Sequence, residues 1–366
     1  MKKREKIQQE ALDAVLKYKR AGCNVSMGVG KTLIGLKYID HLQGVSTRKL
    51  RVLVVAPKLS IFESWKNDAE KFKINIEDVK FTTYLSLNKF NPSEYDIVIL
   101  DECHNLLSSH IMFLEPYTGR VLGLTGTAPR YEKSEKGIMV RRFCPIMYKY
   151  ITDDAVDDEI LNDYRIVVHR MSLSTVNNIL VKSKKDPNKQ FYTSEVKNYN
   201  YWSTRVADAQ TPKQQQITSI MRMKALMDFK TKEDYAKGLF SRITDKCILF
   251  CNTQEQADRL CEHSYHSNNE FSEGNLDLFG NDHITKLSCV LQLSEGVNIP
   301  NLKAGIIMHA YGNERKASQR IGRMLRLNPK ETSTIHVLCY RDTVDESWVK
   351  AALKDFDESK IVYVDV

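Results

Sequence analysis

The chain has 366 residues, enough for about two domains of ordinary size. Hydrophobic residues make up 42% and charged residues 27%, which is typical of a globular protein and argues against a disordered or fibrous one. Lys and Arg exceed Asp and Glu by 54 − 46 = 8 charges, so a polyanionic partner is compatible with the sequence but is not identified by it.

Targeting and membrane segments are not predicted. No apolar run approaches the ~20 residues of a membrane helix, and no apolar stretch follows the basic N-terminal residues as it would in a signal peptide. The eight cysteines contain no CxxC pair. We therefore expect reduced thiols, a cytoplasmic location and no association with a membrane.

The sequence opens with helical periodicity, because apolar residues recur three and four positions apart between Ile7 and Tyr18. Short apolar segments separated by helix-like segments follow, and they recur in the second half of the chain. Strands are predicted at 51–57, 96–100, 121–126, 246–251, 286–292, 304–310 and 333–340. Strands that alternate with helices are typical of parallel sheets covered on both faces, so we expect two α/β halves.

Residues 146–242 differ in character from both halves. An acidic run at 153–159 precedes a β-like segment at 165–174, and a helical segment around 214–240 leads into the second half. We place the domain boundary near 145–165. The predicted parts are a first domain at 1–150, a linker or insert at 151–242 that belongs to the second half, and a second domain at 243–366.

The strongest local signal is SMGVGKT at 26–32. A glycine-rich loop before a helix offers backbone N–H groups to phosphate oxygens. Lys31 would add a positive charge for the β- and γ-phosphates, and Thr32 would add a hydroxyl for Mg²⁺. The usual pattern places a glycine at position 25, where this chain has Val25. A glycine turn that caps a lysine-bearing helix is therefore the alternative.

Two acids and two arginines extend this chemistry. The apolar strand at 96–100 ends in Asp101 and Glu102, at the edge where α/β proteins bind ligands. Asp101 could hold Mg²⁺ through water, and Glu102 could polarise the water that attacks the γ-phosphate, unless the pair only caps a helix. Arg323 and Arg326 can share a helix face and act on phosphate oxygens as arginine fingers, or they can form a solvated face.

These segments resemble, in family order, the motifs of superfamily 2 helicases and translocases. MGVGKT (27–32), VVAPKLSIFESW (54–65), DECH (101–104), LTGTAPR (124–130), ILFCNTQEQADRL (248–260), LSEGVNIP (293–300) and QRIGRMLR (319–326) resemble motifs I, Ia, II, III, IV, V and VI. REKIQQEAL (4–12) is similar to the segment that places a glutamine against adenine. The motifs look closer to remodeller- and repair-type DNA motors than to RNA helicases, in a compact layout that resembles phage helicases.

The resemblance implies two RecA-like parallel-sheet domains in tandem, with ATP in the cleft between them. It implies an ATP- and Mg²⁺-dependent helicase or translocase that acts on DNA, and we expect a monomer. Nucleotide contacts are implied for Gln8, Gly28, Val29, Gly30, Lys31, Thr32 and Gly296, metal binding for Thr32 and Asp101, and catalysis for Glu102, Gln319, Arg323 and Arg326. Contacts with nucleic acid are implied for Pro57, Lys58, Thr83, Thr125, Thr127, Asn252, Thr253, Ser294 and Asn298. Thr125 and Thr127 would couple the nucleotide to the strand, and residues of this last group could instead be turn or capping residues.

Two rival functions stay open: a nucleic-acid-stimulated clamp or annealing switch that does not separate strands, and an RNA helicase. A nucleotide-binding subunit without turnover is disfavoured, because Lys31, Glu102 and Arg326 are all present. The basic, aromatic-rich stretch at 182–205 could contact nucleic acid through phosphates and stacked bases, as a hairpin that opens a duplex. We slightly favour the alternative, in which its aromatic side chains pack on the second domain.

Overall fold

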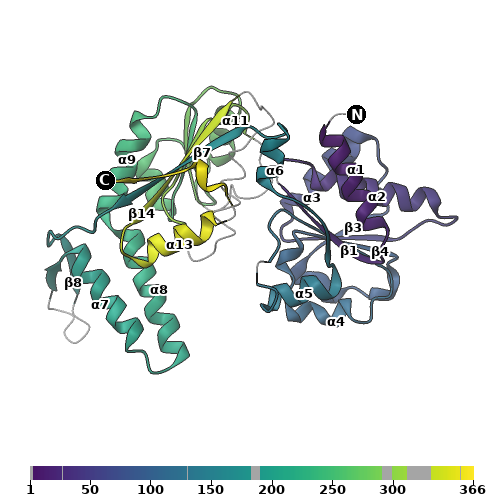
Figure 1. The fold of residues 1–366 in the computed structure, drawn as a ribbon, viewed down its shortest axis with the longest axis horizontal. Helices are drawn as coiled ribbons and strands as arrows, with labels where there is room; N and C mark the ends of the chain where they lie inside the picture. Colours follow the sequence, from purple (N-terminus) through teal and green to yellow (C-terminus); the bar gives the residue numbers. More distant parts are fainter. Residues whose placement is uncertain are drawn as a thin grey trace. The chain divides into compact units, whose positions relative to one another are not determined.

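The computed structural model describes residues 3–26, 28–129, 131–182, 190–290, 299–310, 331–354 and 356–366. They form two compact units (Figure 1). The first unit comprises residues up to Asp163, and the second comprises most of the described residues from Tyr164 onward. Each unit is a sheet with helices packed on it, which is the α/β architecture predicted from the sequence.

The first unit contains a six-stranded sheet in the order β3-β2-β4-β5-β1-β6, in which every neighbouring pair is parallel. The strands are β1 (Arg20–Val25), β2 (Val52–Ala56), β3 (Val79–Thr83), β4 (Ile97–Asp101), β5 (Arg120–Thr125) and β6 (Ile146–Tyr150). All residues of β2 and β4 are buried, as expected for inner strands of a sheet that is covered on both faces.

Helices cover both faces of this sheet (Figure 1). The helices are α1 (Lys3–Leu16), α2 (Lys31–Val45), α3 (Ser60–Phe72), α4 (Ile111–Leu114), α5 (Glu135–Phe143) and α6 (Thr152–Asp157). Helices α1, α2 and α3 form one layer, and α4 and α5 lie on the opposite face with the 3₁₀ turns η1 (Tyr84–Lys89), η3 (Cys103–Asn105) and η4 (Ser108–His110). The carboxyl ends of all six strands therefore lie at one edge, between the two layers.

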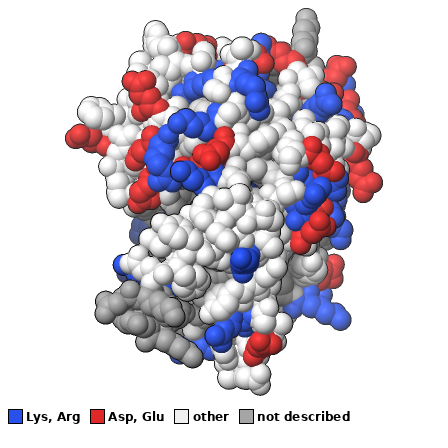
Figure 2. All heavy atoms as spheres, turned by 90° about the vertical axis from the view of Figure 1, so that its left-hand side faces the viewer, with Lys and Arg blue, Asp and Glu red and all other residues white. Residues whose placement is uncertain are grey.

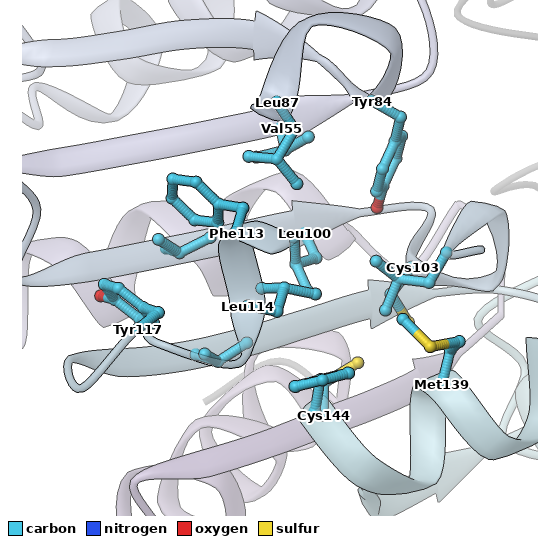
Figure 3. Close-up of a cluster of buried hydrophobic side chains, with 14 of the residues drawn as sticks. Val55, Tyr84, Leu87, Leu100, Cys103, Phe113, Leu114, Tyr117, Met139 and Cys144 are labelled. Carbon is cyan, nitrogen blue, oxygen red and sulfur yellow. The ribbon is translucent and has the colours of Figure 1, made fainter. Parts of the chain in front are cut away.

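A hydrophobic cluster fills the space between the sheet and the α4–α5 layer (Figure 3). Val55 and Leu100 point from the sheet toward Phe113 and Leu114 of α4. Cys103, which directly follows Asp101 and Glu102, is completely buried in the same cluster. The turn that carries Glu102 is thus anchored in the core of the unit.

The second unit contains a seven-stranded sheet in the order β11-β12-β10-β13-β14-β7-β15. The strands are β7 (Asp163–Met171), β10 (Cys247–Phe250), β11 (Ser264–Tyr265), β12 (Lys286–Cys289), β13 (Ala304–Ile307), β14 (Thr332–Tyr340) and β15 (Ile361–Asp365). The helices are α7 (Glu195–Ala207), α8 (Pro212–Asp228), α9 (Lys230–Arg242), α10 (Gln254–Leu260), α11 (Ser272–Gly280) and α13 (Val344–Leu353). An antiparallel ribbon, β8 (Ile179–Lys182) with β9 (Gln190–Thr193), and the paired helices α7 and α8 project from this sheet (Figure 1).

The structure differs from the sequence-based expectations in two instructive places. The helical segment predicted around 214–240 is two helices, because Phe229 between them is extended and packs its buried ring on Tyr340 at 5.8 Å. The strand β1 was not predicted, because polar residues such as Arg20 and Asn24 interrupt its apolar pattern. It is nevertheless an inner strand, paired on both sides.

Within the described residues, no helix combines the length and apolar character needed to cross a bilayer. The eight cysteines all lie in the described ranges, and none forms a disulfide.

Two histidines meet on the neighbouring strands β7 and β14 of the second sheet. His169 Nε2 lies 2.9 Å from Nδ1 of His336, and His169 Nδ1 lies 2.8 Å from the hydroxyl of Tyr235. Burial lowers the pKa of His169, and burial together with the repulsion that a protonated His169 would exert lowers the pKa of His336 to about 4. Both rings are therefore neutral in the native state at neutral pH.

This pair predicts a loss of stability at acid pH. An unfolded histidine has a pKa of about 6.5, so the unfolded chain binds more protons than the native one between pH 6.5 and pH 4. We expect the free energy of unfolding of the second unit to fall by about 2–3 kcal/mol over this interval because of His336 alone. Denaturant titrations at several pH values should show that the free energy of unfolding decreases less in His336→Gln than in the wild type. In His283→Gln, which changes an exposed histidine of the same unit, the decrease should match that of the wild type.

Candidate active site

The loop between β1 and α2 has the geometry of a phosphate-binding turn. Gly28 has a φ of 84° and Gly30 a φ of 103°, values that residues other than glycine rarely adopt. A Cβ atom on Gly30 would also lie 2.8 Å from Nε2 of Gln8. Helix α2 begins at Lys31, directly after Gly30. The unpaired N–H groups of its first turn therefore lie at this loop, where an anion is favoured.

Two side chains of α1 hold the loop in place. Gln8 donates from Nε2 to the carbonyl oxygen of Val29 at 2.7 Å, and Arg4 donates from Nε to the same oxygen at 2.9 Å. Lys37 of α2 donates to Oε1 of Gln8 at 3.3 Å. Gln8 is buried, so this arrangement fixes the loop from inside the unit. Arg4 was missed by the sequence analysis, although its position one helical turn before Gln8 is a usable signal.

The two predicted acids stand opposite the loop. Lys31 Nζ lies 3.6 Å from Oε1 of Glu102, and the two side chains are only 12% and 17% exposed. Glu102 has a φ of 50°, in the left-handed region, which sharply ends β4. Strand β5 separates β4 from β1 in the sheet, and all three are parallel. The phosphate loop and the acids therefore meet at the same sheet edge.

Asp101 is held more firmly than Glu102. Its Oδ2 accepts a hydrogen bond from Nε1 of Trp65 at 2.9 Å, and its Oδ1 accepts one from the backbone N–H of Glu102 at 2.9 Å. Burial, and next the charge of Glu102, raise the pKa of the Asp101 carboxyl above its usual range, while the Trp65 bond and Lys31 oppose that rise. A bound cation would favour the charged carboxylate, as the positive charge of Lys31 does.

A short chain of polar contacts links Glu102 to the segment that follows β5. His104 Nδ1 lies 2.8 Å from Oγ1 of Thr125 and 3.4 Å from Oε2 of Glu102. Thr125 Oγ1 also accepts a hydrogen bond from the backbone N–H of Thr127 at 3.1 Å. Thr125 is completely buried. Its position suits a coupling role inside the unit, not direct contact with nucleic acid.

The other predicted positions separate into three groups. Pro57 and Lys58 follow the end of β2 and Thr83 ends β3, so they lie at the same sheet edge as Lys31. In the second unit, Thr253 caps α10 by accepting from the N–H of Gln256 at 3.2 Å. Asn252, whose backbone N–H donates to the Gln256 side chain, comes directly before this cap. The predictions for Ser294, Gly296, Asn298, Gln319, Arg323 and Arg326 lie outside the described residues.

The donors at the edge suit a nucleoside triphosphate with a hard cation. Mg²⁺ prefers carboxylate and hydroxyl oxygens together with substrate phosphates. Asp101 provides such an oxygen at the end of β4, and Thr32 provides one at the start of α2. The buried Asp101 carboxylate is bonded to an indole and an amide N–H, without a side-chain cation at hydrogen-bond distance among the described residues. That arrangement fits a carboxylate reserved for a metal.

Comparisons with known proteins agree with this arrangement. Residues 1–130 match the family model described as "Type III restriction enzyme, res subunit", and residues 231–328 match the "Helicase conserved C-terminal domain". The DNA 3'-5' translocase XPB2 of Sulfurisphaera tokodaii is 24% identical over 368 residues, which cover 90% of this chain and 80% of that protein.

Two solved structures have a similar fold. The ATP-dependent Type ISP restriction-modification enzyme LlaBIII, bound to DNA, matches with a TM-score of 0.63 and 15% identity, over 98% of this chain but only 31% of that one. The helicase domain of Hef from Pyrococcus furiosus matches with a TM-score of 0.51 and 14% identity, over 95% of this chain and 97% of that one. The predicted pair of RecA-like domains in tandem is confirmed at the level of the fold.

The loop geometry predicts opposite effects for two glycine substitutions around α2. Gly30→Ala should destabilise the first unit by about 1–3 kcal/mol, because its φ of 103° strains alanine and the new Cβ meets Gln8. Gly44→Ala, near the other end of α2 with open space around it, should stabilise by about 0.4–1 kcal/mol. Denaturant unfolding measures both changes, and equal effects of the two substitutions would contradict the strained loop.

Proposed function

We propose that this chain, which belongs to superfamily 2 of the helicases and translocases, couples the hydrolysis of ATP to movement along DNA. Enzymes of this superfamily hydrolyse ATP. The observation that carries the proposal is the meeting of Lys31, Asp101 and Glu102 at one edge of a parallel sheet. A phosphate loop and two acids placed in this way serve phosphoryl transfer.

The first unit can capture the nucleotide with its own residues. The N–H groups at the start of α2 bind phosphate oxygens, and Lys31 turns from Glu102 to the β- and γ-phosphates. This exchange releases the Glu102 carboxylate, which can then accept a proton from the attacking water. Gln8 holds the loop through Val29, and the family resemblance implies that it would contact the adenine. A change in the hydrogen bonds of Gln8 would therefore alter the conformation of the loop directly.

Mg²⁺, held by Thr32 and Asp101, would neutralise charge on the phosphate oxygens. Asp101 contributes an oriented carboxylate, and His104 with Thr125 connects the neighbouring Glu102 to the segment after β5. For Gln319, Arg323, Arg326 and Gly296 the proposal rests on the sequence motifs. The two arginines would stabilise the charge that spreads over the transferred phosphoryl group.

DNA is proposed as the partner, with RNA as the alternative. The relative that covers most of this chain is named as a DNA translocase, and a structural neighbour was solved with DNA bound. The net charge of +8 is compatible with a polyanion. Pro57, Lys58 and Thr83, at the ends of β2 and β3, are proposed to face the DNA, and we propose that the protein acts as a monomer.

The ribbon and helices at 179–228 are proposed as a further DNA contact. Phe191 and Tyr192 of β9 are 50% and 64% exposed, and Tyr201 of α7 is 48% exposed, whereas Tyr199 packs into the second unit. Figure 2 shows blue and red side chains mixed in the upper part of the view, and mostly uncharged surface with scattered blue and less red at the height of α7 and α8. Exposed rings with few acidic neighbours can stack on bases.

The proposal is tested by measuring phosphate release with no nucleic acid, single-stranded DNA, duplex DNA and RNA. We expect DNA to stimulate turnover more than RNA does. A triplex-displacement assay and a strand-displacement assay then distinguish translocation from unwinding. Turnover that no DNA stimulates would contradict the proposed motor, and stimulation without displacement of either kind would favour a clamp.

Two substitutions test the edge of the first sheet. Lys31→Ala should abolish turnover, because the charge that faces the phosphates is lost. Glu102→Gln keeps the shape but not the basic oxygen, so it should bind ATP and DNA while turnover falls about 10²-fold or more. Glu94→Gln, at an exposed position three residues before β4 begins, is the matched control and should keep the wild-type rate. A wild-type rate in Glu102→Gln would assign the activation of water to another residue.

A second prediction concerns the projecting ribbon and helix. Replacing Lys182, Lys197 and Arg205, all exposed, with alanine should weaken DNA binding and flatten its dependence on salt. Each lost phosphate contact should reduce the slope of log K against log salt by about one. Fluorescence anisotropy with a labelled oligonucleotide at several salt concentrations measures this slope.

The control for that experiment removes the same charge elsewhere. Lys17, Lys19 and Lys89 are exposed in the first unit, and their joint replacement with alanine should change the slope less. Equal slopes for both triple variants would show that the projecting segment has a structural role only.

A further inference from the structure

Trp65 of α3 is completely buried, and its one polar atom points at the candidate metal ligand. The indole Nε1 donates to Oδ2 of Asp101 at 2.9 Å. The other oxygen, Oδ1, accepts from the backbone N–H of Glu102. The Asp101 carboxylate is thus oriented by one side chain and one amide, and only the side chain can be changed by substitution.

The surroundings of Trp65 keep the indole in this position. A Cβ atom on Gly35 would lie 2.4 Å from Cη2 of Trp65, so the absence of a side chain on α2 makes room for the ring. On another side the ring meets Phe81 of β3 edge-on, with centroids 6.5 Å apart. The indole therefore lies between the phosphate-loop helix and the sheet, where it has little freedom to turn.

We propose that Trp65 is a positioning residue for the metal: its indole N–H holds the Asp101 carboxylate in the orientation in which Asp101 binds the divalent cation of the nucleotide. The inference rests on the proposed function, because it takes the nucleotide site at this edge as its premise. Groups that hydrogen-bond to a ligating carboxylate typically change metal affinity by about 10- to 100-fold when they are removed.

The position of Trp65 on α3 gives this contact a second consequence. Helix α3 begins at Ser60, directly after the segment with Pro57 and Lys58 that is proposed to face DNA. Trp65 thus joins the helix next to the DNA-facing segment to the carboxylate of the metal site by one hydrogen bond. A shift of α3 on DNA binding would move the hydrogen-bond donor of Asp101 directly, without an intermediate residue.

The test uses Trp65→Phe, which keeps an aromatic ring and removes the N–H donor. Equilibrium binding of Mn²⁺ in the presence of ADP, followed by electron paramagnetic resonance, should weaken about 10- to 100-fold. The Mg²⁺ concentration for half-maximal ATP hydrolysis should rise by a similar factor, while binding of metal-free ADP should be unchanged. Trp348→Phe, a partly buried tryptophan of the second unit, is the matched control and should leave all three values unchanged.

Two further measurements guard against a fold defect in Trp65→Phe. Gly35→Ala keeps the indole N–H donor of Trp65, but the new Cβ atom forces the ring to shift. This variant should therefore also weaken Mn²⁺ binding. In a Trp202→Phe, Trp348→Phe background, Trp65 is the one tryptophan left, and its emission should change when Mg²⁺ is added with ADP.

The outcomes separate this inference from the proposed function. Wild-type Mn²⁺ affinity in folded Trp65→Phe, or Trp65 emission that does not respond to Mg²⁺, would show that Trp65 serves the core alone. If metal binding depends on Trp65 but DNA does not stimulate hydrolysis in the wild type, the positioning role stands and the motor function fails.

Discussion

The desolvated charges at the edge of the first sheet constrain the rest of that unit. Lys31, Asp101 and Glu102 lose much of their water there, and charges so placed are stable only when each has a partner. Lys31 pairs with Glu102, and Asp101 takes donors from an indole and an amide. If the ion pair is exchanged for phosphate oxygens as proposed, the same arrangement that stabilises the folded unit prepares it for a nucleotide.

The scaffold around this edge explains how it stays ordered. Cys103 secures the turn of the acids in the hydrophobic cluster of Figure 3, while α1 secures the phosphate loop through Gln8 and Arg4 on the Val29 carbonyl. These contacts come from opposite layers of the sheet, so the loop and the acids are fixed independently. A substitution in one layer is therefore expected to disturb one half of the site before the other.

The second unit uses buried charges for a structural purpose. Lys232 of α9 is completely buried in a salt bridge with Asp345 of α13 and lies over the ring of Tyr340, 4.6 Å from its centroid. Next to it, the buried Glu195 of α7 accepts hydrogen bonds from Thr231 and from the backbone of Ser174. This network attaches the base of α7, and with it the projecting segment, to the sheet of the second unit. Loss of one partner would leave a buried charge uncompensated, which is strongly destabilising.

The sequence by itself determined the α/β architecture and most of the strands, because apolar runs are local signals. The chemistry of the motif residues was predicted from equally local signals such as the glycine-rich loop. Lys31 and Glu102 were predicted to act together, and the structure brings them together. Tertiary structure alone revealed the inner strand β1, the role of Arg4 and the bond from Trp65 to Asp101. It also showed that Thr253 caps helix α10 and that Thr125 is buried. The reason is physical: a strand with polar residues becomes an inner one only through its neighbours, and a side chain finds a distant partner only once the order of strands is fixed.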